Sequence, residues 1–90
     1  MTRISQDEAR AAAERHLRKL ERGSDPLALM AGETRQTPQG WLFFYNSADY
    51  VASGNMLDAL AGNGPLLVAD SGDVRELDSA TPWEEQLAGA

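Results

Sequence analysis

The sequence of 90 residues contains no cysteine, a single histidine and no long apolar run. Without cysteine, neither a disulfide nor a thiolate–metal site can support the fold, which suits a reducing compartment, so we expect a cytoplasmic protein. Uninterrupted apolar runs reach only five residues, as at residues 41–45, and the N-terminus lacks the apolar stretch of a signal peptide. The sequence therefore predicts neither a membrane span nor a targeting segment.

Basic residues are scarce beyond the first third of the chain. Residues 31–90 hold only Arg35 and Arg75 against nine acidic residues, a net charge of −7, whereas residues 1–30 carry +1. Such an acidic field repels nucleic acid and can steer a basic protein partner toward the surface. The alternative, that the charge only keeps a small protein soluble, stays open from the sequence alone.

Length and composition predict one folded domain over residues 1–90. A chain this short buries only about 60–65% of its unfolded surface and cannot sustain two separate domain cores. At 42% hydrophobic and 24% charged residues, it is too apolar to stay disordered through charge repulsion.

Two capping-box spacings mark the starts of predicted helices. Ser5 and Glu8 are placed so that each side chain satisfies the other's free backbone amide, which predicts an amphipathic helix over residues 6–22. Its basic residues alternate with glutamates, so nucleic-acid binding is not expected there. Residues 81–84 repeat the capping spacing, with Pro82 at the first helical position, and predict a short closing helix.

Four extended segments between the helices are predicted to form two hairpins. The first pairs residues 27–37 with residues 41–46, and the second pairs residues 65–69 with residues 74–77. The fold class is therefore α+β, with an N-terminal amphipathic helix packed on an antiparallel sheet of about four strands and a short C-terminal helix. Residues 47–63 are predicted to be a partly ordered loop with one helical turn.

Alternation along the aromatic strand predicts large apolar groups on both faces of the sheet. Trp41, Phe43 and Tyr45 fall on one face, and Leu42 and Phe44 on the other. One helix can cover only one of these faces. Because the hairpins leave open strand edges, a monomer and an edge-paired homodimer both stay open.

No group of residues has the spacing of a catalytic, metal or cofactor site, so no enzyme activity, metal or cofactor is predicted. Gly62 and Gly64 could begin a phosphate-binding loop, but Leu67 stands where the third glycine belongs. The acidic cluster of residues 70–78 lacks the ligand spacing of a calcium loop. His16 is interpreted as a residue at the edge of the core rather than a ligand or a base.

Several stretches from residue 39 onward resemble the immunity protein 35 family, also described as YrhB-like. They are residues 39–44, 60–68, 71–72 and 81–85. In the family pattern the turn glycine lies one position later, so the hairpin after Val68 is predicted to be one residue tighter here. The residues interpreted as structural are Gly40, Trp41, Phe43, Gly62, Gly64, Pro65, Gly72 and Pro82.

The resemblance implies an immunity protein, which protects a bacterium by binding and blocking a toxin without catalysis. The acidic field would suit a basic toxin. Two alternatives stay open: a small heat-stable chaperone that exposes apolar surface to many unfolded clients, and a regulatory binding module for a neighbouring enzyme. The candidate partner-binding residues are Tyr45, Tyr50, Asp70, Asp73, Glu76 and Asp78.

Overall fold

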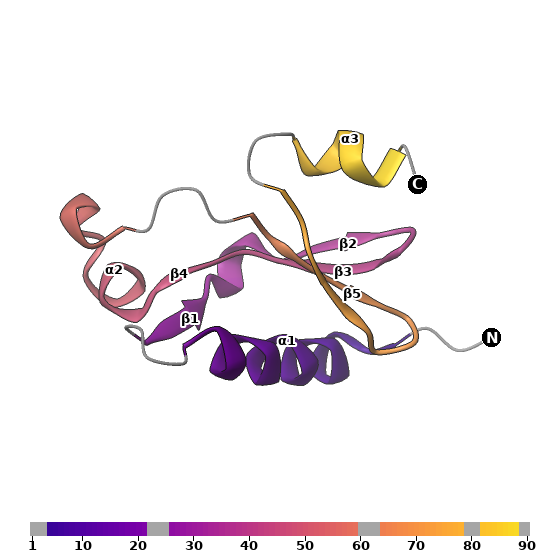
Figure 1. The fold of residues 1–90 in the computed structure, drawn as a ribbon, viewed down its shortest axis with the longest axis horizontal. Coiled ribbons are helices and arrows are strands. Elements are labelled where there is room, and N and C mark those ends of the chain that lie inside the picture. The colour runs from indigo at the N-terminus through magenta and orange to yellow at the C-terminus, as the bar shows by residue number, and fades with distance from the viewer. Residues whose placement is uncertain (1–3, 22–25, 60–63, 79–81, 89–90) are drawn as a thin grey trace.

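Helices cover both faces of an antiparallel sheet in the computed structural model, which describes residues 4–21, 26–59, 64–78 and 82–88 (Figure 1). The α+β class and the long first and short last helix are confirmed. In chain order the elements are α1 (Gln6–Leu20), β1 (Leu27–Leu29), the 3₁₀ turn η1 (Ala31–Glu33), β2 (Arg35–Thr37), β3 (Gly40–Phe43), β4 (Tyr45–Ser47), α2 (Ala48–Ser53), the 3₁₀ turn η2 (Met56–Asp58), β5 (Leu66–Ala69), β6 (Val74–Glu76) and α3 (Trp83–Ala88).

The main sheet has the predicted four strands, in the order β2-β3-β5-β6, and every neighbouring pair is antiparallel. Strands β2 and β3 form the first hairpin, and β5 and β6 form the second. Phe43, Leu66 and Glu76 stand opposite one another across three strands, so their side chains share one face. This register places Glu76, the acidic residue of β6, on the face that α1 covers.

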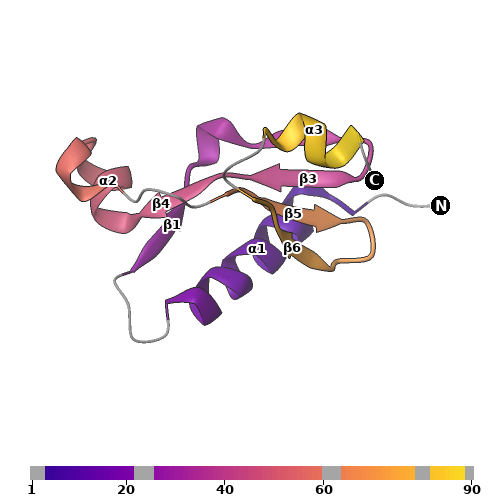
Figure 2. The ribbon, with the colours of Figure 1, turned by 45° about the horizontal axis from the view of Figure 1, so that its top comes forward.

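Two further strands form a second, smaller sheet, because the first predicted hairpin is interrupted. Strand β1 pairs with β4, and η1 lies between β1 and β2. Residues 31–34 stand opposite Phe43 alone, while the amide of Met30 still donates to the carbonyl of Phe44 at 2.8 Å. The inserted residues end the main sheet here, and the β1–β4 ribbon projects beyond it (Figure 2).

Helix α1 covers one face of the main sheet. Ser5 and Glu8 form the predicted capping box, with bonds of 3.1 and 3.2 Å to each other's amides. The helix ends at Leu20, two residues earlier than predicted. Small side chains on its inner face let the helix approach the sheet closely, and they pack with large residues of β3 and β5. The buried residues of this cluster are Ala9, Ala12, Ala13, Leu17, Phe43, Leu66 and Val68.

Helix α3 covers the opposite face, which the first helix cannot reach. The Gln86 side chain holds it in place, because its amide oxygen accepts from the Asp78 amide and its amide nitrogen donates to the Asp78 carbonyl, both at 2.8 Å. Pro82 directly precedes the helix, and Thr81 lies outside the described residues. The second cluster consists of Leu42, Leu67, Leu77 and Leu87, with Phe44 and Trp83 packed against it.

Two glycines allow backbone segments to approach one another closely. At Gly40, a Cβ atom would collide with the carbonyl of Val68 on the paired strand, and φ is 145°. At Gly64, it would collide with the carbonyl of Leu77. Only a residue without Cβ fits such positions unstrained. Gly62 lies outside the described residues.

The segment predicted as a loop, residues 47–63, contains more structure than expected in its described part. The Ser47 hydroxyl caps α2 by accepting from the Tyr50 amide at 3.0 Å, and Gly54 ends the helix with φ of 72°. The Asn55 side chain then caps η2 by accepting from the Leu57 amide at 3.0 Å. These local bonds satisfy backbone groups that a loop would leave to water.

Candidate protein-binding surface

The six candidate partner-binding residues do not form one continuous surface. Tyr50 lies on α2 at one end of the molecule, whereas Asp70 and Asp73 lie in the β5–β6 turn at the other end (Figures 1 and 2). The longest dimension of the chain is 42 Å. The sequence analysis grouped these acidic residues with the tyrosines, but the fold places Asp70 and Asp73 far from Tyr50.

Tyr45 and Glu76 lie together on the face covered by α1. Nε2 of His16 on α1 is 3.1 Å from Oε2 of Glu76. Burial raises the pKa of the Tyr45 hydroxyl, and the nearby charge of Glu76 raises this pKa further. Tyr45 is half-buried and packs against the α1 cluster. This group of side chains joins α1, β4 and β6, and His16 has the core-edge position expected for it.

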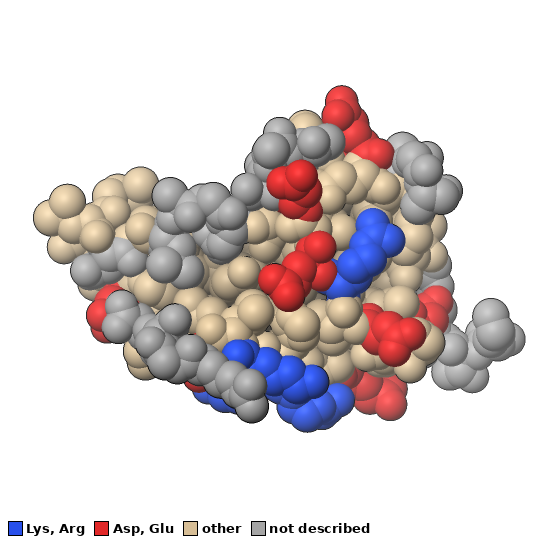
Figure 3. Space-filling view, in the orientation of Figure 1, with Lys and Arg blue, Asp and Glu red and all other residues tan. Residues whose placement is uncertain are grey.

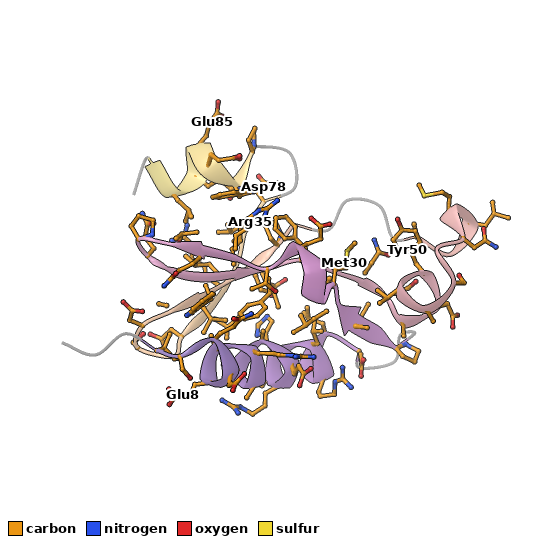
Figure 4. All side chains as sticks on the ribbon, turned by 180° about the vertical axis from the view of Figure 1, so that it is seen from behind. Glu8, Met30, Arg35, Tyr50, Asp78 and Glu85 are labelled. Atoms are coloured by element: carbon orange, nitrogen blue, oxygen red, sulfur yellow. The ribbon has the colours of Figure 1, made fainter. Side chains whose placement is uncertain are left out.

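The remaining acidic candidates lie near other parts of the molecule. Asp70 and Asp73 are exposed in the tight turn, where the amide of Gly72 donates to the carbonyl of Ala69 at 2.8 Å. Asp78, labelled in Figure 4, is exposed, and its backbone is hydrogen-bonded to Gln86 of α3. Acidic and basic groups are interspersed over this region (Figure 3), so their fields partly cancel.

A different surface, at the end that carries α2, exposes large apolar side chains. We define the α2 lobe as residues 48–57. Val51 is 40% exposed, Met56 is 73% exposed and Leu57 is 91% exposed. All six residues of α2 are described, and none of them is buried. The lobe thus contributes nothing to either hydrophobic cluster.

An open hollow of about 350 Å³ lies between η1 and α2, with Val51 in its lining. Met30 and Tyr50 lie next to each other in it (Figure 4). A hollow with an exposed apolar side chain in its lining can receive an apolar group of a partner protein. Its lining residues are Met30, Gly32, Glu33, Tyr50, Val51 and Gly54.

The sequence analysis identified Tyr50 but missed the rest of this surface. Two signals could have found it: a serine at residue 47 with a glycine at residue 54, which cap a helix, and the adjacent pair Met56 and Leu57 among polar residues. Because α2 buries no side chain, it lacks the apolar periodicity by which helices are usually recognised.

The described ranges contain neither a cluster of metal ligands nor an unsatisfied buried polar side chain. Among them, no group of three histidine or acidic residues is close enough to hold a metal ion. Every buried side-chain nitrogen or oxygen in the same ranges has a hydrogen-bond partner. None of the helices in this part of the chain is long and apolar enough to cross a membrane. The exposed large apolar side chains of the same ranges all lie in the α2 lobe.

Comparisons with known proteins agree with the resemblance noted in the sequence. Residues 7–88 match the family Immunity protein 35. The chain is also 38% identical over 50 residues to "Uncharacterized protein YrhB" of Escherichia coli (strain K12). That alignment covers 54% of this chain and 53% of YrhB, so the chain matches about half the length of this curated relative. No solved structure matches. Because the family match extends over most of the sequence, the chain belongs to the immunity protein 35 family.

Proposed function

We propose that this protein neutralises a cognate bacterial toxin by binding it directly, without catalysing a reaction. The family match over residues 7–88 carries this proposal. To block the active site of a toxin, a protein needs only a stable fold with a defined exposed patch. The α2 lobe is one such patch. We place this action in the cytoplasm, which a chain without cysteine suits.

The charge distribution supports a basic toxin as the partner. Residues 31–90 combine nine acidic residues with only Arg35 and Arg75, for a net charge of −7. A field of this sign accelerates the approach of a basic protein and disfavours acidic competitors. Association should therefore slow as the salt concentration rises.

General binding of unfolded proteins is the second candidate function, because exposed apolar groups favour it. A holdase needs accessible apolar surface, and Met56 and Leu57 provide some. A regulatory module for a neighbouring enzyme would use the same kind of surface with a different partner. The number of partners distinguishes these functions, since a holdase binds many clients weakly.

The test is capture of partners from the native lysate on the tagged full chain at moderate salt, followed by co-expression. We expect one stoichiometric partner that is released by high salt and is toxic when expressed alone, and whose toxicity this chain relieves. A broad set of unrelated clients that grows on heating would reject toxin neutralisation and favour the holdase. A single non-toxic enzyme would favour the regulatory module.

A further inference from the structure

The α2 lobe is held in one conformation although it belongs to neither hydrophobic cluster. Side chains bridge its turns: the Ser53 hydroxyl donates to the Asp49 carbonyl at 2.8 Å and accepts from the Asn55 amide at 3.1 Å. The amide of Ala48 donates to the Pro26 carbonyl at 2.9 Å, which ties the start of α2 to the β1 side of the ribbon. A surface held in this way loses little conformational entropy when it binds.

Within this conformation, the apolar groups lie where a partner can reach them. Met56 and Leu57 protrude at η2, which packs against α2, and the hollow beside α2 has Met30 and Tyr50 in its wall. The hollow has room at Gly32, where an added Cβ would meet no atom within 4 Å. An incoming apolar side chain could therefore enter the hollow, while Met56 and Leu57 offer further exposed apolar groups on η2.

The charged residues in the lining of the hollow and in the α2 lobe are both acidic. Glu33 in the wall of the hollow and Asp49 in the first turn of α2 are exposed. Residues 36–74 contain no lysine or arginine. A partner that buries the apolar groups must approach these carboxylates, and lysine or arginine on the partner would satisfy them.

We propose that the α2 lobe is the docking surface for the neutralised toxin, and that the toxin presents a basic segment carrying a protruding apolar side chain. This inference rests on the proposed function and specifies its contact. A second copy of the chain fits the lobe less well, because two lobes face to face would bring the Glu33 and Asp49 carboxylates of both copies into one interface. Like charges brought together at an interface oppose association.

A synthetic peptide of lysine and leucine tests the inference without knowledge of the toxin. Amide chemical shifts of the isotopically labelled full chain are followed as this peptide is added, and then as an analogue with glutamate in place of lysine is added. We expect the lysine peptide to shift amides of residues 30–33 and 48–57 first, and the glutamate analogue to leave them unchanged.

Variants at the lobe provide the second measurement. Leu57→Ser and Met56→Gln should each weaken lysine-peptide binding about ten-fold, as expected for apolar anchors of an interface. Because both side chains are mostly exposed, these variants should fold normally. Asp49→Asn should also weaken binding, whereas Asp7→Asn is its matched control, since Asp7 has the same first-turn position in α1.

Four results of the peptide experiment would overturn the inference: no binding of the lysine peptide, shifts centred on another surface, equal binding of the glutamate analogue, or lobe shifts that depend only on protein concentration. The last result would assign the lobe to a second copy. If the parent chain binds the lysine peptide but neutralises no toxin, the proposed function alone would be rejected. Neutralisation that survives combined Met56→Gln and Leu57→Ser would reject this surface alone.

Discussion

Replacement of Gly40 by alanine should destabilise the fold, because the backbone of β5 occupies the space that a side chain needs. The added Cβ would collide with the carbonyl of Val68 and lie 2.9 Å from Cα of Ala69. These are backbone atoms, so no side-chain rotation relieves the contact. The φ of 145° at Gly40 adds strain for any residue with a Cβ atom.

The magnitude follows from three effects. Overpacking of a filled site costs about 1–3 kcal/mol, and an unfavourable backbone conformation costs about 1–3 kcal/mol. Reduced freedom of the unfolded chain offsets about 0.4–1 kcal/mol. The free energy of unfolding should therefore fall by about 1–6 kcal/mol, a large part of the roughly 5–14 kcal/mol expected for a folded chain of 90 residues.

The control is the same substitution at Gly32, where the added Cβ meets no atom within 4 Å. Since no positive φ constrains that residue, Gly32→Ala should leave stability unchanged or raise it by up to about 1 kcal/mol. Urea denaturation followed by circular dichroism measures both variants against the parent chain. Equal midpoints for Gly40→Ala and Gly32→Ala would show that the close approach of β3 and β5 does not constrain the fold.

Three further predictions concern contacts between elements. Burial and the charge of Glu76 raise the pKa of Tyr45 above 10.0, so the fold favours the neutral phenol. The contribution of Tyr45 to stability should be intact below pH 10.0 and be lost as the pH rises through the folded-state pKa. In alkaline denaturation, Tyr45→Phe should reduce this loss of stability. Alanine substitutions of His16 and Glu76 in a double-mutant cycle should give a coupling energy of only about 0.2–1 kcal/mol, because the Glu76 side chain is 53% exposed and water screens its charge. A coupling energy well above this range would show that water does not screen the pair. Gln86→Ala removes both hydrogen bonds to the Asp78 backbone and should lower the free energy of unfolding by about 1–3 kcal/mol, measured by thermal unfolding. The control Glu85→Ala, on the exposed side of α3, should lower it by less than about 0.5 kcal/mol. Equal losses would show that the Gln86 side chain does not hold α3 on the sheet.

Local signals predicted the parts of the fold that depend on neighbours in sequence. The capping box of Ser5 and Glu8 fixes the start of α1 through bonds that span three residues. Alternation at residues 41–45 predicted apolar groups on both faces, and α1 and α3 each cover one. These features were readable because each requires only a short stretch of chain to adopt regular geometry.

Features that depend on pairing between strands far apart in the sequence could not be predicted from the sequence. The interruption at η1 arises because residues 31–34 stand opposite Phe43 alone, and nothing within those residues shows what they will face. For the same reason the sequence grouped Tyr50 with Asp70 and Asp73, which the sheet places at opposite ends of the molecule. Sequence order ranks residues along the chain, while strand pairing decides their neighbours in space.

The separation of core and lobe leads to a last expectation that links stability to binding. The two hydrophobic clusters contain every buried apolar residue of the described ranges, and the α2 lobe contributes none of them. Substitutions at Met56 and Leu57 should therefore change the free energy of unfolding by less than about 0.5 kcal/mol. If the lobe is the docking surface, the same substitutions weaken binding about ten-fold, which corresponds to about 1.4 kcal/mol. A loss of binding accompanied by an equal loss in the free energy of unfolding would instead mean that the lobe stabilises the fold.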